Sequence, residues 1–149
     1  MKALTILPPY ALQIWAGTKT IEYRTWTRNY RGDLLICSSN KKFRNCVCGY
    51  ALCVAELYDI TPRMGEDSDT HEPAFVGEYE WHLRNVRPIK PIPLKGYVSL
   101  WNADVEDKLE FLPRFPEDGV TEDVEKAWIE KYIQPLVYKP DAPLLSRQH

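Results

Sequence analysis

Hydrophobic and polar residues alternate near the start of the chain in a pattern that predicts two strands around one short helix. Residues 2–7 alternate and are rich in β-favouring side chains, and a pair of prolines ends this strand. Residues 9–16 have proline in the first turn, an apolar stripe and Gly17 directly after them, which predicts a helix of about two turns. Residues 18–27 alternate again, so we expect a strand with one buried and one polar face.

The middle of the chain contains further strand candidates at residues 33–38, 47–60, 79–89 and 97–101. Residues 61–77 contain two prolines, two glycines and several carboxylates, a composition typical of a long loop. The acidic residues in and beside this segment are Glu66, Asp67, Asp69, Glu72 and Glu78. Long loops in small domains are often lids or binding loops.

The C-terminal part predicts a second helix over residues 121–133. Thr121 is a suitable N-cap, acidic residues fill the first turn, and Pro135 stands beyond the end. We expect the tail from Lys139 onward to be loosely held. Because helices do not alternate with strands, the order of elements favours an α+β domain whose strands curl into a small barrel, rather than a doubly wound parallel sheet.

Composition adds limits to this picture. The chain has 149 residues, of which 44% are hydrophobic and 27% charged, enough for one domain with its own core. No apolar run approaches the length of a membrane-spanning helix, and two prolines interrupt the first apolar stretch where the centre of a secretory signal would lie. We therefore expect a cytoplasmic protein with no membrane partner.

Four cysteines lie between residues 37 and 53, in a chain large enough to be stable without disulfides. Reduced thiols that act as small buried hydrophobes are the favoured interpretation. Cys46 and Cys48 do not have the spacing of paired zinc-binding motifs, and His71 and His82 stand apart from one another. The sequence thus predicts no metal site, and it contains no motif for a cofactor.

Charge is distributed unevenly. Residues 1–48 carry eight lysine and arginine residues against two carboxylates, a net charge of +6, and the remaining residues carry 11 against 19, a net charge of −8. This asymmetry indicates a basic patch that could contact phosphates. The overall charge of −2 is unlike that of nonspecific duplex binders, so a polyanion would have to be bound locally.

One cluster of charged side chains is a candidate binding site. In a strand, Glu22 and Arg24 lie on the same face, whereas Lys19 has the opposite parity and must reach in from the preceding turn. With Tyr10 nearby, these groups suit a nucleotide: arginine for phosphate, glutamate for an exocyclic amine, an aromatic ring for stacking. On spacing alone, a solvated ladder of charges worth about 0–1 kcal/mol per pair is the more common alternative.

The same residues carry a resemblance to a known family. The ordered motifs resemble those of the ASCH domain family, which is related to the PUA-like β-barrels. They are Leu7-Pro8-Pro9-Tyr10-Ala11, Gly17-x-Lys19-x-x-Glu22-x-Arg24, and Arg31-Gly32-Asp33 leading to Ser38-Ser39, with residues 81–88, 91–96 and 100–101 similar to the second half of the domain. We therefore predict a single ASCH-like domain over residues 1–149, with its motif-bearing core at about 3–101 and a helical extension at about 102–149.

The resemblance implies a barrel with a cleft, lined by the first helix and the strand after it, that engages RNA or a modified nucleoside. Some similar proteins are amidohydrolases that remove an acyl group from acetylated cytidine, using a lysine, a threonine three residues later and a distant glutamate, and others have been assigned ribonuclease activity. Lys19 matches the lysine, but Glu22 stands where those hydrolases have the threonine. Pro8 replaces a glutamine found in many members.

Three functions remain open on this basis. The leading hypothesis is a module that binds RNA or a modified nucleotide; the residues assigned to binding are Tyr10, Arg24, Arg28, Arg31, Ser38 and Lys41. The alternative is a hydrolase of acylated nucleosides or RNA with Lys19 and Glu22 as catalytic residues, Glu22 being the general base and Lys19 stabilising developing negative charge. The third hypothesis is a protein-interaction module that uses the acidic segment 61–78 and the helix 121–133 as its contact surface.

Overall fold

The computed structural model describes residues 1–113 and 121–140. Its strands form one six-stranded sheet in the order β2-β5-β4-β3-β1-β6, in which only β1 and β3 pair in parallel. The elements are β1 (Lys2–Ile6), α1 (Pro8–Trp15), β2 (Ile21–Arg24), β3 (Gly32–Ser38), β4 (Tyr50–Glu66), β5 (Pro73–Pro93), β6 (Trp101–Asn102), the 3-10 turn η1 (Glu106–Lys108), α2 (Glu122–Tyr132) and the 3-10 turn η2 (Gln134–Leu136). The α+β class predicted from the sequence is confirmed.

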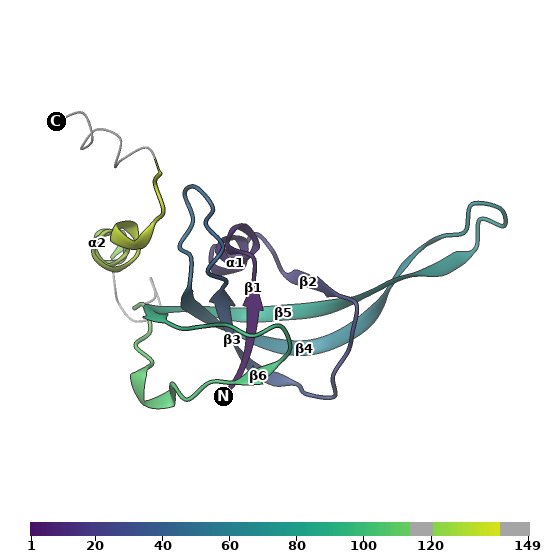
Figure 1. Ribbon diagram of the computed structural model, residues 1–149, viewed down its shortest axis with the longest axis horizontal. Coiled ribbons are helices and arrows are strands. Elements are labelled where there is room, and N and C mark those ends of the chain that lie inside the picture. Colours follow the sequence, from purple (N-terminus) through teal and green to yellow (C-terminus); the bar gives the residue numbers. More distant parts are fainter. Residues whose placement is uncertain (114–120, 141–149) are drawn as a thin grey trace.

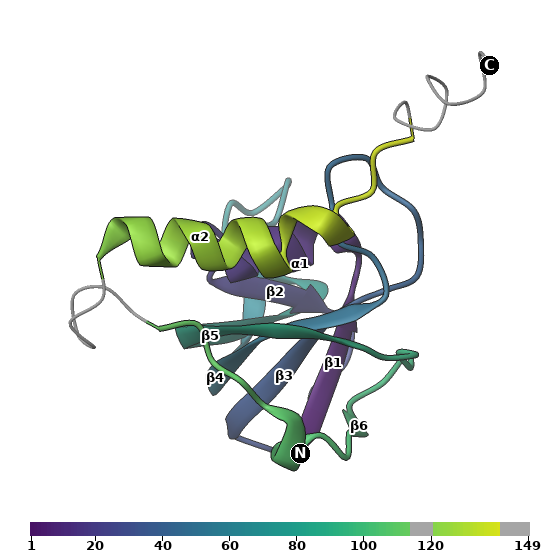
Figure 2. The same cartoon turned by 90° about the vertical axis from the view of Figure 1, so that its left-hand side faces the viewer.

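The sheet is buried on both faces at its centre. In β3, Leu34 and Leu35 point to opposite sides and both are fully buried. One side packs against α1 and α2, and the other packs against the segment that contains Ala103 and Val105. Figure 2 shows the two helices on one side of the sheet and the segment around β6 on the other. The sheet is therefore the middle layer of the domain.

The predicted closed barrel is wrong. Within the described residues the two outermost strands, β2 and β6, are not paired with one another. β2 has four residues and β6 has two, so neither is long enough to complete a ladder around a barrel. The sheet curls instead, and Arg24 of β2 bridges to β1 by donating from Nη2 to the carbonyl oxygen of Thr5 at 2.9 Å. The Arg24 side chain therefore connects β2 to β1, two strands that are not paired in the sheet.

The predicted loop over residues 61–77 is also wrong. β4 continues to Glu66 and β5 begins at Pro73, so the two strands form a long hairpin with a turn at residues 67–72. Its outer part projects away from the body of the sheet (Figure 1). The prolines are tolerated because Pro73 is the first residue of its strand and Pro62 lies beside a register shift. We call residues 58–80 the ribbon.

Other boundaries differ by a few residues. β4 begins at Tyr50 rather than at 47, after Gly49 with a φ of +84°, and β2 occupies only the centre of the predicted strand 18–27. Of the predicted strand 97–101, only the last residue enters β6, because Tyr97 donates its N–H to the Thr5 side chain rather than to a neighbouring strand.

The Thr121 cap and the second helix are confirmed. Of the tail predicted to be loosely held, residues 141–149 lie outside the described residues. Among the described helices, none is long and apolar enough to cross a bilayer.

The four cysteines are free thiols, as predicted, and all are buried. Burial raises the pKa of Cys37 to about 12, and burial also raises the pKa of Cys53. Because the thiolate is the reactive form, both should be inert toward dithionitrobenzoate at neutral pH in the folded protein and should react promptly in urea. Mass spectrometry of the labelled peptides checks this expectation, and prompt labelling of either cysteine without urea would contradict it.

Candidate functional site

The candidate site is a pocket at the point where the ends of β1 and β2 meet the start of α1. Its volume is about 520 Å³. The residues that line it are Thr5, Ile6, Leu7, Tyr10, Glu22, Tyr23, Arg24, Ser39, Gly96, Tyr97 and Val98. Three of the predicted site residues, Tyr10, Glu22 and Arg24, are thus in the lining.

Glu22 is the buried charge of the pocket wall. The residue is only 6% exposed and faces a cation on either side. Its Oε1 accepts the N–H of Tyr23 at 3.0 Å and lies 3.7 Å from Lys19 Nζ, while its Oε2 lies 3.5 Å from Arg24 Nη2. A buried carboxylate requires such partners, because removing an unpaired charge from water is costly. Glu22 therefore holds two cations at the pocket.

Lys19 reaches this cluster from the turn after α1. Gly17 ends the helix with a φ of +82°, and the N–H of Lys19 donates to the carbonyl of Gln13 at 3.1 Å. The ammonium lies 5.2 Å from the ring centroids of both Tyr10 and Tyr23. The three charged side chains converge as the sequence predicts, although Lys19 stands beside the pocket rather than in its lining.

Two buried polar atoms of the pocket lining have no hydrogen-bond partner among the described residues. They are Arg24 Nε and Ser39 Oγ. Leaving a buried donor unpaired costs about 1–3 kcal/mol, so a ligand that supplies an acceptor recovers this cost. Arg24 is also held in place, because its Nη2 is bonded to the Thr5 carbonyl. The pocket thus has a fixed guanidinium edge with an N–H that is not used by the protein.

Aromatic rings surround the opening. Tyr10 is 47% exposed and Tyr97 is 56% exposed. Tyr97 is supported by Trp101, with ring centroids 5.1 Å apart, and Trp101 Nε1 donates to Thr5 Oγ1 at 3.1 Å. Trp101 is itself partly buried, and a partly exposed ring such as Tyr97 that rests on it can stack on a planar ligand.

The remaining predicted binding residues lie outside the pocket. The guanidinium of Arg28 covers the Trp26 ring at 4.3 Å, and Arg31 lies 4.0 Å from Asp59 and bonds to nearby carbonyls. Lys41 Nζ is 5.7 Å from the Phe43 ring centroid. Ser38 is buried, and its hydroxyl donates to the carbonyl of Tyr50 at 3.1 Å.

Eight residues of the lining were not among the predicted site residues, and they are Thr5, Ile6, Leu7, Tyr23, Ser39, Gly96, Tyr97 and Val98. Ser39 could have been found from the sequence, because it directly follows the strand predicted at residues 33–38. In the structure its N–H donates to the Ile6 carbonyl at 2.9 Å. Tyr97 and Thr5 are 92 residues apart in the chain and meet only in the fold, so no local pattern could pair them.

Comparison with known families decides the family of the chain. The sequence model of the ASCH domain matches residues 4–93, more than half of the chain. The chain belongs to the ASCH domain family. Domains of this family are generally thought to bind RNA. The match includes most of the pocket lining and ends shortly before Gly96 and Tyr97.

Solved structures similar to this ASCH domain include the ASCH protein from Zymomonas mobilis, which is 15% identical with a TM-score of 0.48 over 93% of this chain and 96% of that chain. Two mutant forms of the Zymomonas mobilis protein are 19% identical with a TM-score of 0.45, over 62% of this chain and 73% and 75% of theirs. A comparison with curated proteins finds no match.

Proposed function

We propose that this ASCH domain binds single-stranded RNA by inserting one base, plain or modified, into the pocket between β1, β2 and α1. The observation that carries the proposal is that Arg24 and Ser39, two residues of the pocket lining, each have a buried polar atom, Nε and Oγ, without a partner among the described residues. A base edge offers carbonyl and ring-nitrogen acceptors to such donors. A volume of about 520 Å³ has room for a nucleoside.

The rings at the opening support the same proposal. Single-stranded RNA is bound by stacking its bases on aromatic side chains, and Tyr10 and Tyr97 offer partly exposed rings on the pocket lining. The Lys19 ammonium, which lies 5.2 Å from the Tyr10 ring centroid, adds positive charge beside that ring. The pocket therefore combines hydrogen-bonding, stacking and electrostatic contacts.

Phosphates of the flanking nucleotides would be contacted by the basic rim. Arg28 follows β2 closely, and Lys41 follows the pocket residue Ser39 by two positions. Both belong to the part of the chain that carries the net charge of +6 in residues 1–48. Ion pairs with phosphate make RNA affinity depend on salt, so binding should weaken as the salt concentration rises.

Removing the stacking rings tests this function. We expect Tyr10→Ala and Tyr97→Ala each to weaken binding to a panel of single-stranded RNAs by about fivefold to a hundredfold, because a stacked base contributes about 1–3 kcal/mol. Fluorescence anisotropy with labelled RNA measures the effect. Tyr58→Ala is the matched control, since Tyr58 is 43% exposed and lies outside the pocket lining. Equal affinities for all three variants and the unaltered protein would contradict the proposal.

Hydrolysis of an acylated nucleoside is the second candidate function, and the 3.7 Å approach of Lys19 Nζ to the Glu22 carboxylate is the observation in its favour. Against it, Oε1 of Glu22 accepts the Tyr23 N–H and Oε2 faces Arg24, so both oxygens have partners. We expect acetylated cytidine to be recovered unchanged after incubation, as judged by chromatography. Release of acetate that Lys19→Ala abolishes would assign the hydrolase instead.

A further inference from the structure

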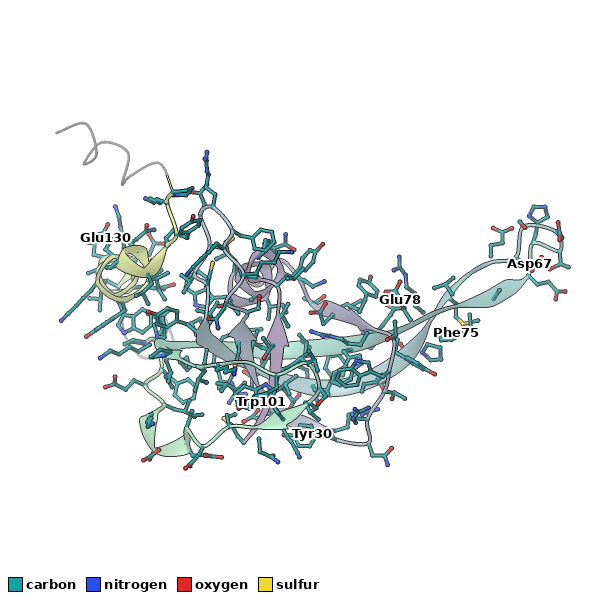
Figure 3. The ribbon with its side chains drawn as sticks, viewed as in Figure 1. Tyr30, Asp67, Phe75, Glu78, Trp101 and Glu130 are labelled. Carbon is teal, nitrogen blue, oxygen red and sulfur yellow. The ribbon has the colours of Figure 1, made fainter. Side chains whose placement is uncertain are left out.

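The ribbon carries apolar side chains with no protein layer to cover them. Met64 is 54% exposed, and Phe75 and Val76 are each 49% exposed. Figure 3 shows Phe75 on the projecting part of the hairpin, well away from Trp101 in the body of the domain. A two-stranded hairpin has no core of its own and is only marginally stable in water. Exposed apolar side chains on such an element indicate an interaction surface.

Met64 and Phe75 continue a row of apolar side chains that starts in the core. Trp81 is fully buried, and Tyr79 packs partly buried against the same core cluster. The Phe75 ring lies 5.3 Å from the Tyr79 ring, and Met64 pairs directly with Phe75 across the two strands. Side chains two or four residues apart on a strand share one face. One face of the ribbon is therefore an apolar stripe that leads outward from the core.

The charge of the ribbon is strongly negative. Residues 58–80 carry seven carboxylates and one arginine, a net charge of −6. At the tip, Asp67 accepts the N–H groups of Asp69 and Thr70 at 2.9 Å, and these bonds lower the pKa of Asp67. Glu66 pairs with His71 at 2.8 Å. The turn is therefore held by hydrogen bonds to Asp67, whose carboxylate stays negative at neutral pH.

We propose that the ribbon is a docking surface for a basic protein partner, which covers Met64 and Phe75 with apolar side chains and places lysine or arginine against the carboxylates of the tip. Charge complementarity selects this occupant. RNA carries the same sign of charge as the ribbon and is repelled by it, and two ribbons of −6 repel each other. Met64, Phe75 and the carboxylates of the tip do not line the pocket, so the proposal does not depend on the proposed function.

The test uses two labelled peptides of equal positive charge. One consists of lysine and leucine and the other of lysine and serine, and fluorescence anisotropy measures their binding to the intact protein. We expect the leucine peptide to bind at least about tenfold more tightly, because covering Met64 and Phe75 removes apolar surface from water. We expect its affinity to fall with rising salt, because the contact is also electrostatic.

Variants locate the contact. Met64→Ser combined with Phe75→Ser should weaken binding of the leucine peptide by about tenfold or more. Asp69→Lys combined with Glu72→Lys changes only exposed turn residues, so it tests the charge even if the apolar variant does not fold. The matched controls are Val124→Ser, whose side chain is 51% exposed on α2, and Asp104→Lys, an exposed carboxylate far along the chain. Both controls should bind as the unaltered protein does.

Three results would overturn the proposal. The first is equal affinity of the ribbon variants and the controls for the leucine peptide. The second is a dimer in analytical ultracentrifugation that Phe75→Ser abolishes, because a second copy would then be the occupant. The third is loss of RNA binding in the ribbon variants, because RNA would then occupy this face. Ribbon variants that keep RNA binding but lose the peptide separate this surface from the pocket.

Discussion

Replacing Glu22 with alanine is expected to lower the free energy of unfolding by about 3 kcal/mol, because a buried ion pair that loses one partner leaves a buried charge uncompensated. Glu22 is 6% exposed, and Lys19 and Arg24 lie 3.7 Å and 3.5 Å from its carboxylate. Their side chains are only 15% and 19% exposed, so water replaces the carboxylate poorly. Urea denaturation measures the change.

Glu56→Ala is the matched control for this prediction. Glu56 is also paired with an arginine, Arg84, but that arginine is 61% exposed. Exposed ion pairs contribute about 0–1 kcal/mol, so the control should lose little stability. Glu22→Gln keeps the size of the side chain and removes its charge, and it should resemble the alanine variant. Similar losses for Glu22→Ala and Glu56→Ala would show that the pocket cluster is not a buried charge network.

Replacing Arg24 with alanine is expected to weaken RNA binding by more than about tenfold, because a hydrogen bond to a charged group contributes about 1.5–3 kcal/mol. The Nε of Arg24 is a buried donor without a partner in the described residues, while Nη2 donates to the Thr5 carbonyl and to Glu22. Arg24→Lys keeps the charge and loses the planar fork, so it should recover only part of the affinity. Anisotropy titrations with single-stranded RNA measure both variants.

The control here is Arg84→Ala. Arg84 lies over the Tyr58 ring at 4.4 Å and outside the pocket lining, so its loss removes a positive charge of the same size elsewhere. We expect a small change in affinity that disappears at high salt. Circular dichroism confirms that each variant is folded before binding is measured. An Arg24→Ala protein that binds RNA as tightly as Arg84→Ala does would contradict the assigned role.

The local elements of the fold could be predicted because their signals are local. The Thr121 cap, the glycine stop at Gly17 and the apolar β3 all depend on residues close in sequence. The ribbon could not be predicted, because its prolines, glycines and carboxylates favour a loop. Only the pairing of β4 with β5 outweighs that local preference. The sequence could not distinguish an open sheet from a barrel. Closure depends on the lengths of β2 and β6 and on which strands, distant in sequence, they pair with.

The site was predictable only in part. Strand parity placed Glu22 beside Arg24, and the same argument required Lys19 to come from the turn. Parity also explains why Ser38 misses the pocket, since its side chain bonds to the Tyr50 backbone while the next residue, Ser39, lines the pocket. Tyr97 belongs to a segment far from β1 in the sequence, and its position depends on a hydrogen bond to Thr5 that no sequence pattern predicts.

We expect an RNA base to enter the pocket and to accept a hydrogen bond from Arg24 Nε. The most direct measurement is an NMR titration of the isotope-labelled protein with a short single-stranded RNA, following the Arg24 Nε–H signal together with the backbone amides. We expect this side-chain signal to shift strongly and the amides of Tyr10, Ser39 and Tyr97 to shift with it. An unchanged Arg24 Nε–H signal, with the largest shifts on the ribbon or on α2, would contradict it.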